Sequence, residues 1–246
     1  MAPWRRFVAL GDSVTEGVGD PLARGLRGWA ARLAEALAPL DDGFTFVNLA
    51  HRGLTTGEIR DQQLERALQL EPDLASAIAG MNDAIKPWFS EEAIAEPLEQ
   101  IVGELSGAGA TVLMATLPDV TRTLPLTSSR RSRFRGRLEA ANVVIRDTAG
   151  RHPNTLLIDA RGFAEEMRGG NFSIDRLHPN SRGHLMIARA FAERLTETGE
   201  ATIALPELVD VPLVGRESLR HAAWVLRNGV GPEVLRRAAA LRRLGR

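Results

Sequence analysis

The amino-acid sequence predicts an α/β fold in which a parallel β-sheet is covered by helices on both faces. Short apolar runs alternate with longer segments in which apolar residues recur every three or four positions, as in buried strands followed by amphipathic helices. Several of these runs end in glycine, aspartate, asparagine or serine, which favour turns. With 246 residues, 44% of them hydrophobic and 25% charged, the chain suits one domain, alone or with an appendage.

The first strand is expected at residues 7–10, a Phe-Val-Ala-Leu run that suits a strand buried on both faces. Gly11 ends the run and permits a sharp turn into Asp12 and Ser13. Ser13 therefore falls at the carboxyl end of a strand, where open α/β sheets bind their ligands. Taken alone, this turn also fits a serine that only caps the next helix.

The remaining elements follow in the same alternation. Further strands are expected at residues 44–49, 74–79, 111–115 and 155–158. Helices are expected at residues 29–37, 55–70, 90–106, 133–149 and 181–196, with Thr55 or Thr56, Ser90 and Ser181 as caps. The connection over residues 118–131 is long for this fold class, so we expect a functional or mobile loop there, such as a flap over the leaving group.

The composition changes after Gly199, which predicts a domain over residues 1–198 and a C-terminal extension over residues 199–246. Two Arg-rich helical patterns, at residues 217–227 and 232–244, follow Pro206 and Pro212. We interpret this tail as an amphipathic helical pair packed on the domain. An arm that binds nucleic acid or a protein partner is the alternative.

The overall composition argues against several classes of protein. Lys and Arg number 31 and Asp and Glu also number 31, so no net charge favours nucleic acid or an anionic membrane. The chain has no cysteine, which excludes disulfides and thiolate chemistry, and its five histidines suggest no metal cluster. Neither a signal-like leader nor a membrane-spanning run is apparent, so a cytoplasmic location is expected.

Chemistry-bearing residues follow four of the expected strands. Ser13, Gly53 and Asn82 lie after the first three, and Asp175 and His178 lie near the last helix. The spacing of three places the Asp175 carboxylate within reach of one ring nitrogen of His178, leaving the other nitrogen for a serine hydroxyl. A hydroxyl becomes a nucleophile when a base removes its proton, and the carboxylate fixes the tautomer of that base. The pattern therefore predicts Ser13 as nucleophile, His178 as base and Asp175 as its partner.

Acyl transfer also needs donors that face the developing oxyanion. The backbone N–H groups of Ser13 and Gly53 and the side-chain amide of Asn82 supply three, and a Cβ at residue 53 would crowd the acyl oxygen. Each residue taken singly has a simpler reading: Gly53 and Asn82 fit turns, and His178 fits a helix entry. Their joint occurrence in this order favours a hydrolase.

Four blocks carry a resemblance to a known family: Gly11-Asp12-Ser13 with Thr15 and Gly17, Asn48 through Gly53, Gly80-Met81-Asn82-Asp83, and Asp175-x-x-His178-Pro179-Asn180 with Gly183-His184. The chain resembles the SGNH hydrolases, the GDSL-type esterase/lipase superfamily, over about residues 8–195. The resemblance implies a flavodoxin-like three-layer α/β/α fold with a five-stranded parallel sheet. It also implies Ser13, Asp175 and His178 as a triad and no metal or organic cofactor. It says nothing of the tail.

We therefore expect a serine esterase that hydrolyses small-molecule carboxylic esters, with short- to medium-chain acyl groups, through an acyl-Ser13 intermediate. Ile85, Trp88 and Phe89 are candidates for the wall of an acyl pocket, although Trp88 and Phe89 also fit packing on the next helix. The arginines of residues 130–137 fit either a site for an anionic leaving group or a solvated helix start. A carbohydrate O-deacetylase, thioesterase or lysophospholipase on the same scaffold is the alternative, and a non-catalytic binding module is a further one. A flavodoxin-like nucleotide binder is disfavoured because no G-x-G-x-x-G pattern is present.

Overall fold

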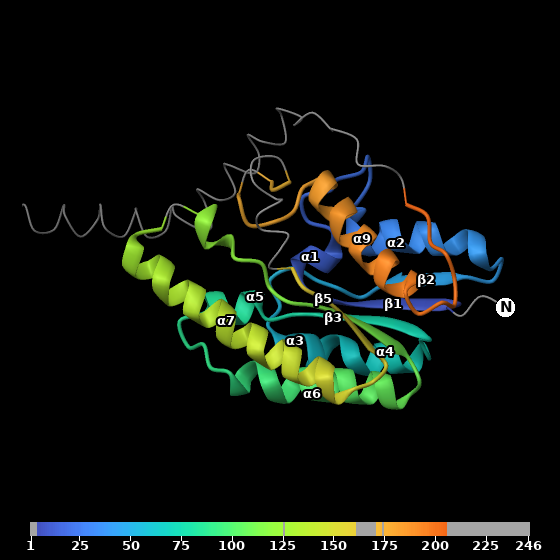
Figure 1. Cartoon of the computed structure of the whole chain (residues 1–246), viewed down its shortest axis with the longest axis horizontal. Helices are drawn as coiled ribbons and strands as arrows, with labels where there is room; N and C mark the ends of the chain where they lie inside the picture. The colour runs from blue at the N-terminus through green and yellow to red at the C-terminus, as the bar shows by residue number, and fades with distance from the viewer. Residues whose placement is uncertain (1–3, 125, 161–170, 174, 206–246) are drawn as a thin grey trace, which may run out of the picture.

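The computed structural model describes residues 4–124, 126–160, 171–173 and 175–205. Within these residues, five strands form one all-parallel sheet in the order β2-β1-β3-β4-β5 (Figure 1). The strands are β1 (Arg6–Gly11), β2 (Thr45–Asn48), β3 (Leu74–Ile78), β4 (Thr111–Ala115) and β5 (Thr155–Ile158). Helices cover both faces of the sheet, so the predicted fold class is confirmed.

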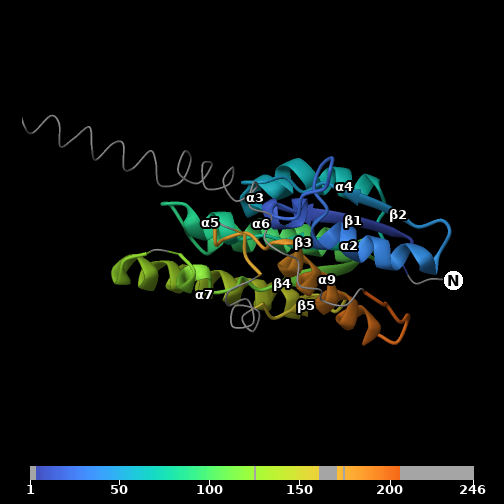
Figure 2. The same cartoon turned by 90° about the horizontal axis from the view of Figure 1, so that it is seen from above.

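Alternate residues of the strands face opposite helical layers. In β1, Phe7 and Ala9 pack toward α2 (Gly28–Leu37) and α9 (Ser181–Thr196), which run side by side in both views (Figures 1 and 2). Val8 and Leu10 pack toward the opposite layer. That layer consists of α3 (Thr56–Ile59), the π-helical η2 (Arg60–Leu64), α4 (Glu65–Gln69), α6 (Glu92–Gly107) and α7 (Ser128–Arg151). The three central strands β1, β3 and β4 are buried on both faces over most of their length, which explains their apolar runs, whereas the edge strands β2 and β5 are only partly buried.

Two short helices lie at strand ends where the sequence predicted only turns. They are α1 (Ser13–Glu16) after β1 and α5 (Met81–Ile85) after β3. The nucleophile candidate Ser13 and the donor candidate Asn82 therefore both sit in the first turn of a helix. The carboxyl ends of β1 and β3, which are neighbours in the sheet, bring these two helices together.

The start of α7 and the cap of α9 differ from the prediction. Helix α7 begins at Ser128 rather than residue 133, because the Thr127 side chain caps it by accepting a hydrogen bond from the N–H of Arg130. The preceding connection is correspondingly shorter and includes the 3₁₀ turn η3 (Val120–Arg122). Ser181 does not cap α9, since Asn180 does so by accepting from the N–H groups of Arg182 and Gly183.

The start of α6 is close to the prediction. Ser90 Oγ accepts a hydrogen bond from the N–H of Ala93 at 3.2 Å, although the helix itself begins at Glu92. The sequence had placed this helix start at Ser90, two residues earlier. Thr55 caps α3 in a reciprocal capping box with Glu58, as one of the two candidate caps predicted.

The predicted tail helices at residues 217–227 and 232–244 lie outside the described residues. Residues 199–205 are described, and their apolar members Ala201, Ile203 and Leu205 pack against the α2/α9 layer. The boundary after residue 198 stays a prediction. None of the helices in the described ranges has both the length and the apolar character needed to cross a bilayer.

Candidate active site

The turn after β1 places Ser13 at the carboxyl edge of the sheet. Asp12 caps α1 by accepting a hydrogen bond from the N–H of Val14 at 3.0 Å, so that Ser13 becomes the first helical residue. Gly11, at the end of β1, exchanges hydrogen bonds through its N–H and C=O with the buried side chain of Gln63, at 2.9 and 3.0 Å. Gln63 belongs to η2, so this π-helical stretch fixes the strand end that carries the serine.

Ser13, His178 and Asp175 form one hydrogen-bonded chain. The Oγ of Ser13 lies 2.8 Å from Nε2 of His178, and Nδ1 of the same ring lies 2.5 Å from Oδ2 of Asp175. Both Ser13 and His178 are 8% exposed, so little bulk water screens this chain. Because the carboxylate accepts from Nδ1–H, Nε2 is left as the acceptor that faces the serine hydroxyl.

The Asp175 carboxylate is held in place by its own loop. Its Oδ1 accepts hydrogen bonds from the N–H groups of Leu177 and His178, both at 3.0 Å. Burial alone would raise the pKa of Asp175, but the hydrogen bond and charge of His178 and these N–H groups outweigh it and hold that pKa below its usual range. Asp175 is therefore an anion at any pH at which an esterase is assayed, which is what stabilisation of an imidazolium requires.

The backbone between Asp175 and His178 adopts a conformation uncommon for a side-chain-bearing residue. Arg176 has φ of 58°, in the left-handed region. The N–H of Arg176 donates to the carbonyl of Ser173 at 2.8 Å, and Thr123 Oγ1 donates to the carbonyl of Arg176 at 2.7 Å. The connection before α7, for which a flap was one possibility, thus contacts the loop that carries the histidine.

Among the described residues, two backbone donors at the carboxyl edge of the sheet have no acceptor. The N–H of Ser13 opens α1, where no intrahelical acceptor exists, and the described residues provide no hydrogen-bond partner for it or for the N–H of Gly53. Gly53 has φ of 85°, and a Cβ built there would meet nothing within 4 Å. The conformation of the backbone, rather than crowding by the protein, is therefore the structural reason for glycine at this position.

The third predicted donor, Asn82, is already engaged. Its Nδ2 donates to the carbonyl of Leu54 at 2.9 Å and to Oδ2 of Asp12 at 3.1 Å. Both partners can only accept hydrogen bonds, so the amide group of Asn82 must turn its nitrogen, and not its oxygen, toward Leu54 and Asp12. An oxyanion in this position would have to take the place of one of them.

Asp12 is a buried carboxyl next to this amide. Burial raises the pKa of Asp12 to about 6, and the N–H of Val14 and the charge of His178 offset only part of that effect. Sequence reasoning treated Asp12 as a turn residue. Its contact with Asn82, 70 positions away, could not be read from spacing.

Two of the three candidate pocket residues lie at the surface. Ile85 is 47% exposed and Trp88 is 73% exposed, with the Lys86 ammonium 5.7 Å from the Trp88 ring centroid. Phe89 instead packs against the core, under the guanidinium of Arg137. The reading of Trp88 as a residue packed on the next helix is wrong. The role of Ile85 and Trp88 in substrate binding stays a prediction.

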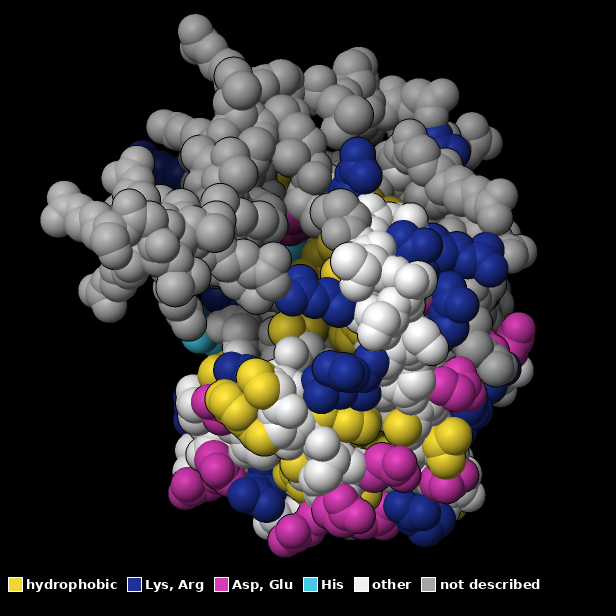
Figure 3. Space-filling view, turned by 90° about the vertical axis from the view of Figure 1, so that its left-hand side faces the viewer, with side chains coloured by type: hydrophobic (Ala, Val, Ile, Leu, Met, Phe, Trp, Pro, Cys, Tyr) yellow, Lys and Arg dark blue, Asp and Glu magenta, His cyan; other side chains and the backbone are white. Residues whose placement is uncertain are grey.

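Part of the arginine-rich start of α7 has structural partners. Arg137 donates to the carbonyls of Ala84, Lys86 and Pro87, at 2.7–3.3 Å, and so fixes the loop that carries Trp88. Arg135 pairs with Asp119 at 3.0 Å. Lys and Arg side chains gather on the face toward which this end of α7 points (Figure 3).

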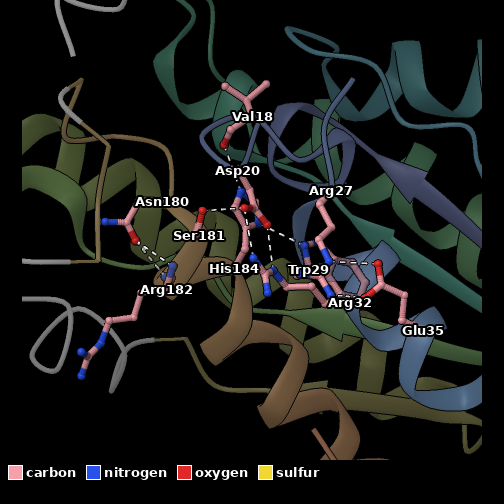
Figure 4. Close-up of polar contacts among 11 residues, drawn as sticks. Val18, Asp20, Arg27, Trp29, Arg32, Glu35, Asn180, Ser181, Arg182 and His184 are labelled. Atoms are coloured by element: carbon pink, nitrogen blue, oxygen red, sulfur yellow. Dashed lines mark hydrogen bonds and ion pairs between the residues drawn. The ribbon is translucent and has the colours of Figure 1, made fainter. Parts of the chain in front are cut away.

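A second buried histidine joins the loop after α1 to α9 (Figure 4). His184 is fully buried, its Nδ1 accepts from the N–H of Trp29 at 3.2 Å, and its Nε2 lies 3.0 Å from the carbonyl of Val18. These contacts require a neutral ring with the proton on Nε2. Burial lowers the pKa of His184 to about 4, in agreement with a neutral ring.

Asp20 links the same two segments through charge. It accepts hydrogen bonds from Arg32 at 2.8 and 3.1 Å and from the Ser181 hydroxyl at 2.6 Å (Figure 4). Although burial alone would raise the pKa of Asp20, these partners lower it. The sequence offered no signal for this network, which connects the loop beyond Ser13 to the helix beyond His178.

The comparisons with known proteins agree with the fold. Among solved structures, LAE5, an α/β hydrolase enzyme from the metagenome of Lake Arreo, Spain, aligns with a TM-score of 0.64 at 22% identity, covering 78% of this chain and 95% of that one. A catalytic mutant of Axe2, an acetylxylan esterase from Geobacillus stearothermophilus, aligns with a TM-score of 0.63 at 20% identity, covering 78% of this chain and 94% of that one. A lipase/acylhydrolase from Enterococcus faecalis aligns with a TM-score of 0.62 at 20% identity, covering 82% of this chain and 99% of that one.

The sequence comparisons extend this agreement to the family. An acetylxylan esterase from Geobacillus stearothermophilus is 22% identical over 212 residues, covering 77% of this chain and 93% of that protein. The sequence model of the GDSL-like Lipase/Acylhydrolase family matches residues 9–186, which include the four blocks of the site. The chain therefore belongs to the GDSL-like lipase/acylhydrolase family, the SGNH hydrolases, whose members are esterases and acylhydrolases.

Proposed function

We propose that this protein is a serine esterase that hydrolyses carboxylic esters with short- to medium-chain acyl groups through an acyl-Ser13 intermediate. The hydrogen-bonded chain from Ser13 Oγ through the His178 ring to Asp175 carries the proposal, because it is the arrangement that makes a serine hydroxyl nucleophilic.

In the first half of the reaction, Ser13 Oγ attacks the ester carbonyl while His178 Nε2 takes its proton. Asp175 stabilises the imidazolium that forms. The N–H groups of Ser13 and Gly53 donate to the oxyanion, and Asn82 adds a third donor when its bond to Asp12 is released. His178 then gives its proton to the leaving alcohol as the C–O bond breaks, which leaves the acyl group on Ser13.

In the second half, water takes the place of the alcohol. His178 removes a proton from the water as its oxygen attacks the acyl carbonyl, and the oxyanion forms at the same donors. Collapse of this intermediate breaks the bond to Ser13 Oγ, which recovers a proton from His178. The products are the carboxylic acid and the free enzyme.

Removal of acetyl groups from carbohydrates is the second candidate. Relatives of this chain are named acetylxylan esterases, and the exposed ring of Trp88 presents a flat apolar face of the kind on which sugar rings stack.

A cytoplasmic location stays a prediction.

The test is a substrate panel with one variant. Wild-type protein is assayed on nitrophenyl esters of increasing acyl length, acetylated xylo-oligosaccharides, an acyl thioester and a lysophospholipid. We expect turnover of the shorter nitrophenyl esters, labelling by a fluorophosphonate probe, and loss of both in Ser13→Ala, with rates at least about 10³-fold lower. Retained turnover in a folded Ser13→Ala protein would refute the proposal. A higher kcat/KM on the acetylated sugars than on any nitrophenyl ester would select the second candidate.

A further inference from the structure

The loop that carries Gly53 is tied to the helix that carries Ser13 by one carboxylate. Glu16, the last residue of α1, accepts hydrogen bonds from three N–H groups of Arg52. The main-chain N–H lies 2.8 Å from Oε2, Nε lies 3.0–3.1 Å from both oxygens, and Nη2 lies 2.7 Å from Oε1. Glu16 therefore holds the backbone of Arg52 as well as its side chain.

The two ends of this interaction differ in their surroundings. The Glu16 side chain is 19% exposed, whereas that of Arg52 is 55% exposed. An ion pair with an exposed guanidinium is screened by water and contributes little to stability. A backbone N–H bonded to a mostly buried carboxylate is a charge-assisted hydrogen bond, shorter and stronger than a neutral one. The backbone contact is therefore the part of the pair that water weakens least.

This contact lies one residue before the predicted oxyanion donor. On the other side of Gly53, the carbonyl of Leu54 accepts from Asn82 at 2.9 Å. Gly53 itself, at φ of 85°, has a backbone free to adopt many conformations, and the described residues offer its N–H no acceptor. Its orientation therefore depends on the two anchors that flank it, Glu16 through Arg52 and Asn82 through Leu54.

We propose that Glu16 is a positioning residue for the oxyanion donor at Gly53, and that it acts through the main-chain N–H of Arg52 rather than through the guanidinium. The proposal rests on the proposed function, because it assigns Glu16 a part in the same acyl transfer. The Ser13 N–H is fixed by the start of α1, and Glu16 ends that helix. One four-residue helix thus sets the nucleophile and two of the oxyanion donors relative to one another.

This mechanism predicts an asymmetry between the two partners. Arg52→Ala removes the guanidinium but keeps the N–H that Glu16 accepts. Glu16→Ala removes the acceptor for the main-chain N–H of Arg52 and for its guanidinium. Glu16→Gln keeps a carbonyl oxygen that can accept from the main-chain N–H. Glu99→Ala is the matched control, since Glu99 pairs with Arg151 and His152 through side chains alone. These two partners precede the amino end of β5, at the edge of the sheet opposite Ser13.

The kinetic experiment compares these four variants on a nitrophenyl ester. Loss of a whole oxyanion donor lowers kcat by about 10²–10³-fold, so a displaced donor in Glu16→Ala should lower kcat by about 30- to 100-fold with KM within about threefold. We expect Arg52→Ala within about fivefold of wild type, Glu16→Gln within about tenfold, and Glu99→Ala unchanged. Equal losses in Glu16→Ala and Arg52→Ala, or a change confined to KM, would overturn the proposal.

A second readout does not depend on turnover. In ¹⁵N–¹H spectra, the Gly53 amide resonance should move in Glu16→Ala and stay close to its wild-type position in Glu16→Gln, while most other resonances remain unchanged. An unmoved Gly53 resonance in Glu16→Ala would refute the positioning role even if the enzyme were active. Conversely, the wild-type protein could hydrolyse no ester while the Gly53 resonance still moved in Glu16→Ala. That result would contradict the proposed function but not the positioning of Gly53 by Glu16.

Discussion

Asp12 holds the side-chain amide of Asn82, with Oδ2 of the buried carboxyl 3.1 Å from Nδ2. The other hydrogen of this amide is bonded to the carbonyl of Leu54, so both hydrogens of the proposed third oxyanion donor are occupied. In the mechanism proposed above, an oxyanion competes with the Asp12 carboxylate for the same N–H. The proposal therefore gives Asp12 the role of orienting the amide until the oxyanion forms.

Asp12→Asn should lower kcat by about tenfold with little change in KM. A carboxylate accepts from both Val14 and Asn82, whereas a carboxamide has one acceptor oxygen, so one of the two bonds is lost. The measurement is steady-state hydrolysis of a nitrophenyl ester at pH 7.5, with Asn82→Ala as the reference for loss of the whole donor, expected at about 10²–10³-fold. A wild-type kcat in Asp12→Asn would mean that the carboxylate does not orient the amide.

The same substitution should change how stability depends on pH. The pKa of Asp12 is raised from 3.8 to about 6, so the folded protein binds this proton more tightly than the unfolded chain. The contribution to stability is fully present below pH 3.8 and is lost as the pH rises through 6. Asp12→Asn removes this dependence. The measurement is the free energy of unfolding in urea at pH 4 and at pH 7.5. The difference between the variant and wild type should shift in favour of the variant by an amount on the order of 3 kcal/mol at the higher pH. No shift in this difference between the two pH values would contradict a raised pKa of the buried Asp12 carboxyl.

His184 should act in the opposite direction. Burial lowers its pKa from 6.5 to about 4, so the unfolded chain binds this proton more tightly. Its contribution is present above pH 6.5 and is lost as the pH falls through 4. Glutamine at this position offers an acceptor and a donor but does not titrate. The free energy of unfolding in urea should therefore fall less in His184→Gln than in wild type between pH 7 and pH 4, by an amount on the order of 3 kcal/mol. Parallel pH profiles for the variant and wild type would be inconsistent with a neutral buried ring.

Thr123 should support the loop that carries the histidine. Its one hydroxyl hydrogen faces two carbonyl oxygens, that of Arg176 at 2.7 Å and that of Val120 at 2.8 Å. Arg176 is the residue with the left-handed backbone between Asp175 and His178. Thr123→Val keeps the shape and removes the donor, which should lower kcat by about three- to tenfold, because loss of such a hydrogen bond is worth about 1 kcal/mol. Thr123→Ser keeps the hydroxyl and should recover most of the activity. Equal kcat values for the two variants would exclude this role.

Gly19→Ala should inactivate the enzyme. A Cβ at this residue would lie 1.9 Å from the carbonyl oxygen of Pro179, and the φ of 102° disfavours any side chain. Relief of the clash moves the loop after Ser13 away from the segment that follows His178. Gly57→Ala is the control, since a Cβ there meets nothing within 4 Å. The check is the rate of fluorophosphonate labelling of Ser13, which should fall at least tenfold in Gly19→Ala alone.

Much of the fold and the core of the site followed from local signals in the sequence. The three central strands are largely apolar because both of their faces are buried. The predicted bounds of all five strands lie within two residues of those observed. Asp175 and His178 are close in sequence, and Ser13 follows a strand, so spacing and strand order suffice to bring them together. Their catalytic roles stay predictions until Ser13→Ala is assayed.

The residues that hold the site in place were not predictable in this way. Glu16 contacts Arg52 across 36 positions, Ser181 contacts Asp20 across 161, and Gln63 contacts Gly11 across 52. Nothing local marks one of many glutamates or arginines as the partner of another. Asn180 rather than Ser181 caps the helix, because the Asn180 side chain accepts from the N–H groups of Arg182 and Gly183. The Ser181 hydroxyl instead donates to Asp20, a contact that only the folded chain creates.

The hydrogen bond between Ser13 and His178 joins residues 165 positions apart, and this distance affects the enzyme while it is being made. During synthesis the serine leaves the ribosome long before the histidine does. On the proposed mechanism, a chain synthesised as far as β4 carries the proposed nucleophile without the proposed base. Ester cleavage then requires the segment that holds His178 to lie beside Ser13, so activity is expected only after α9 has been made.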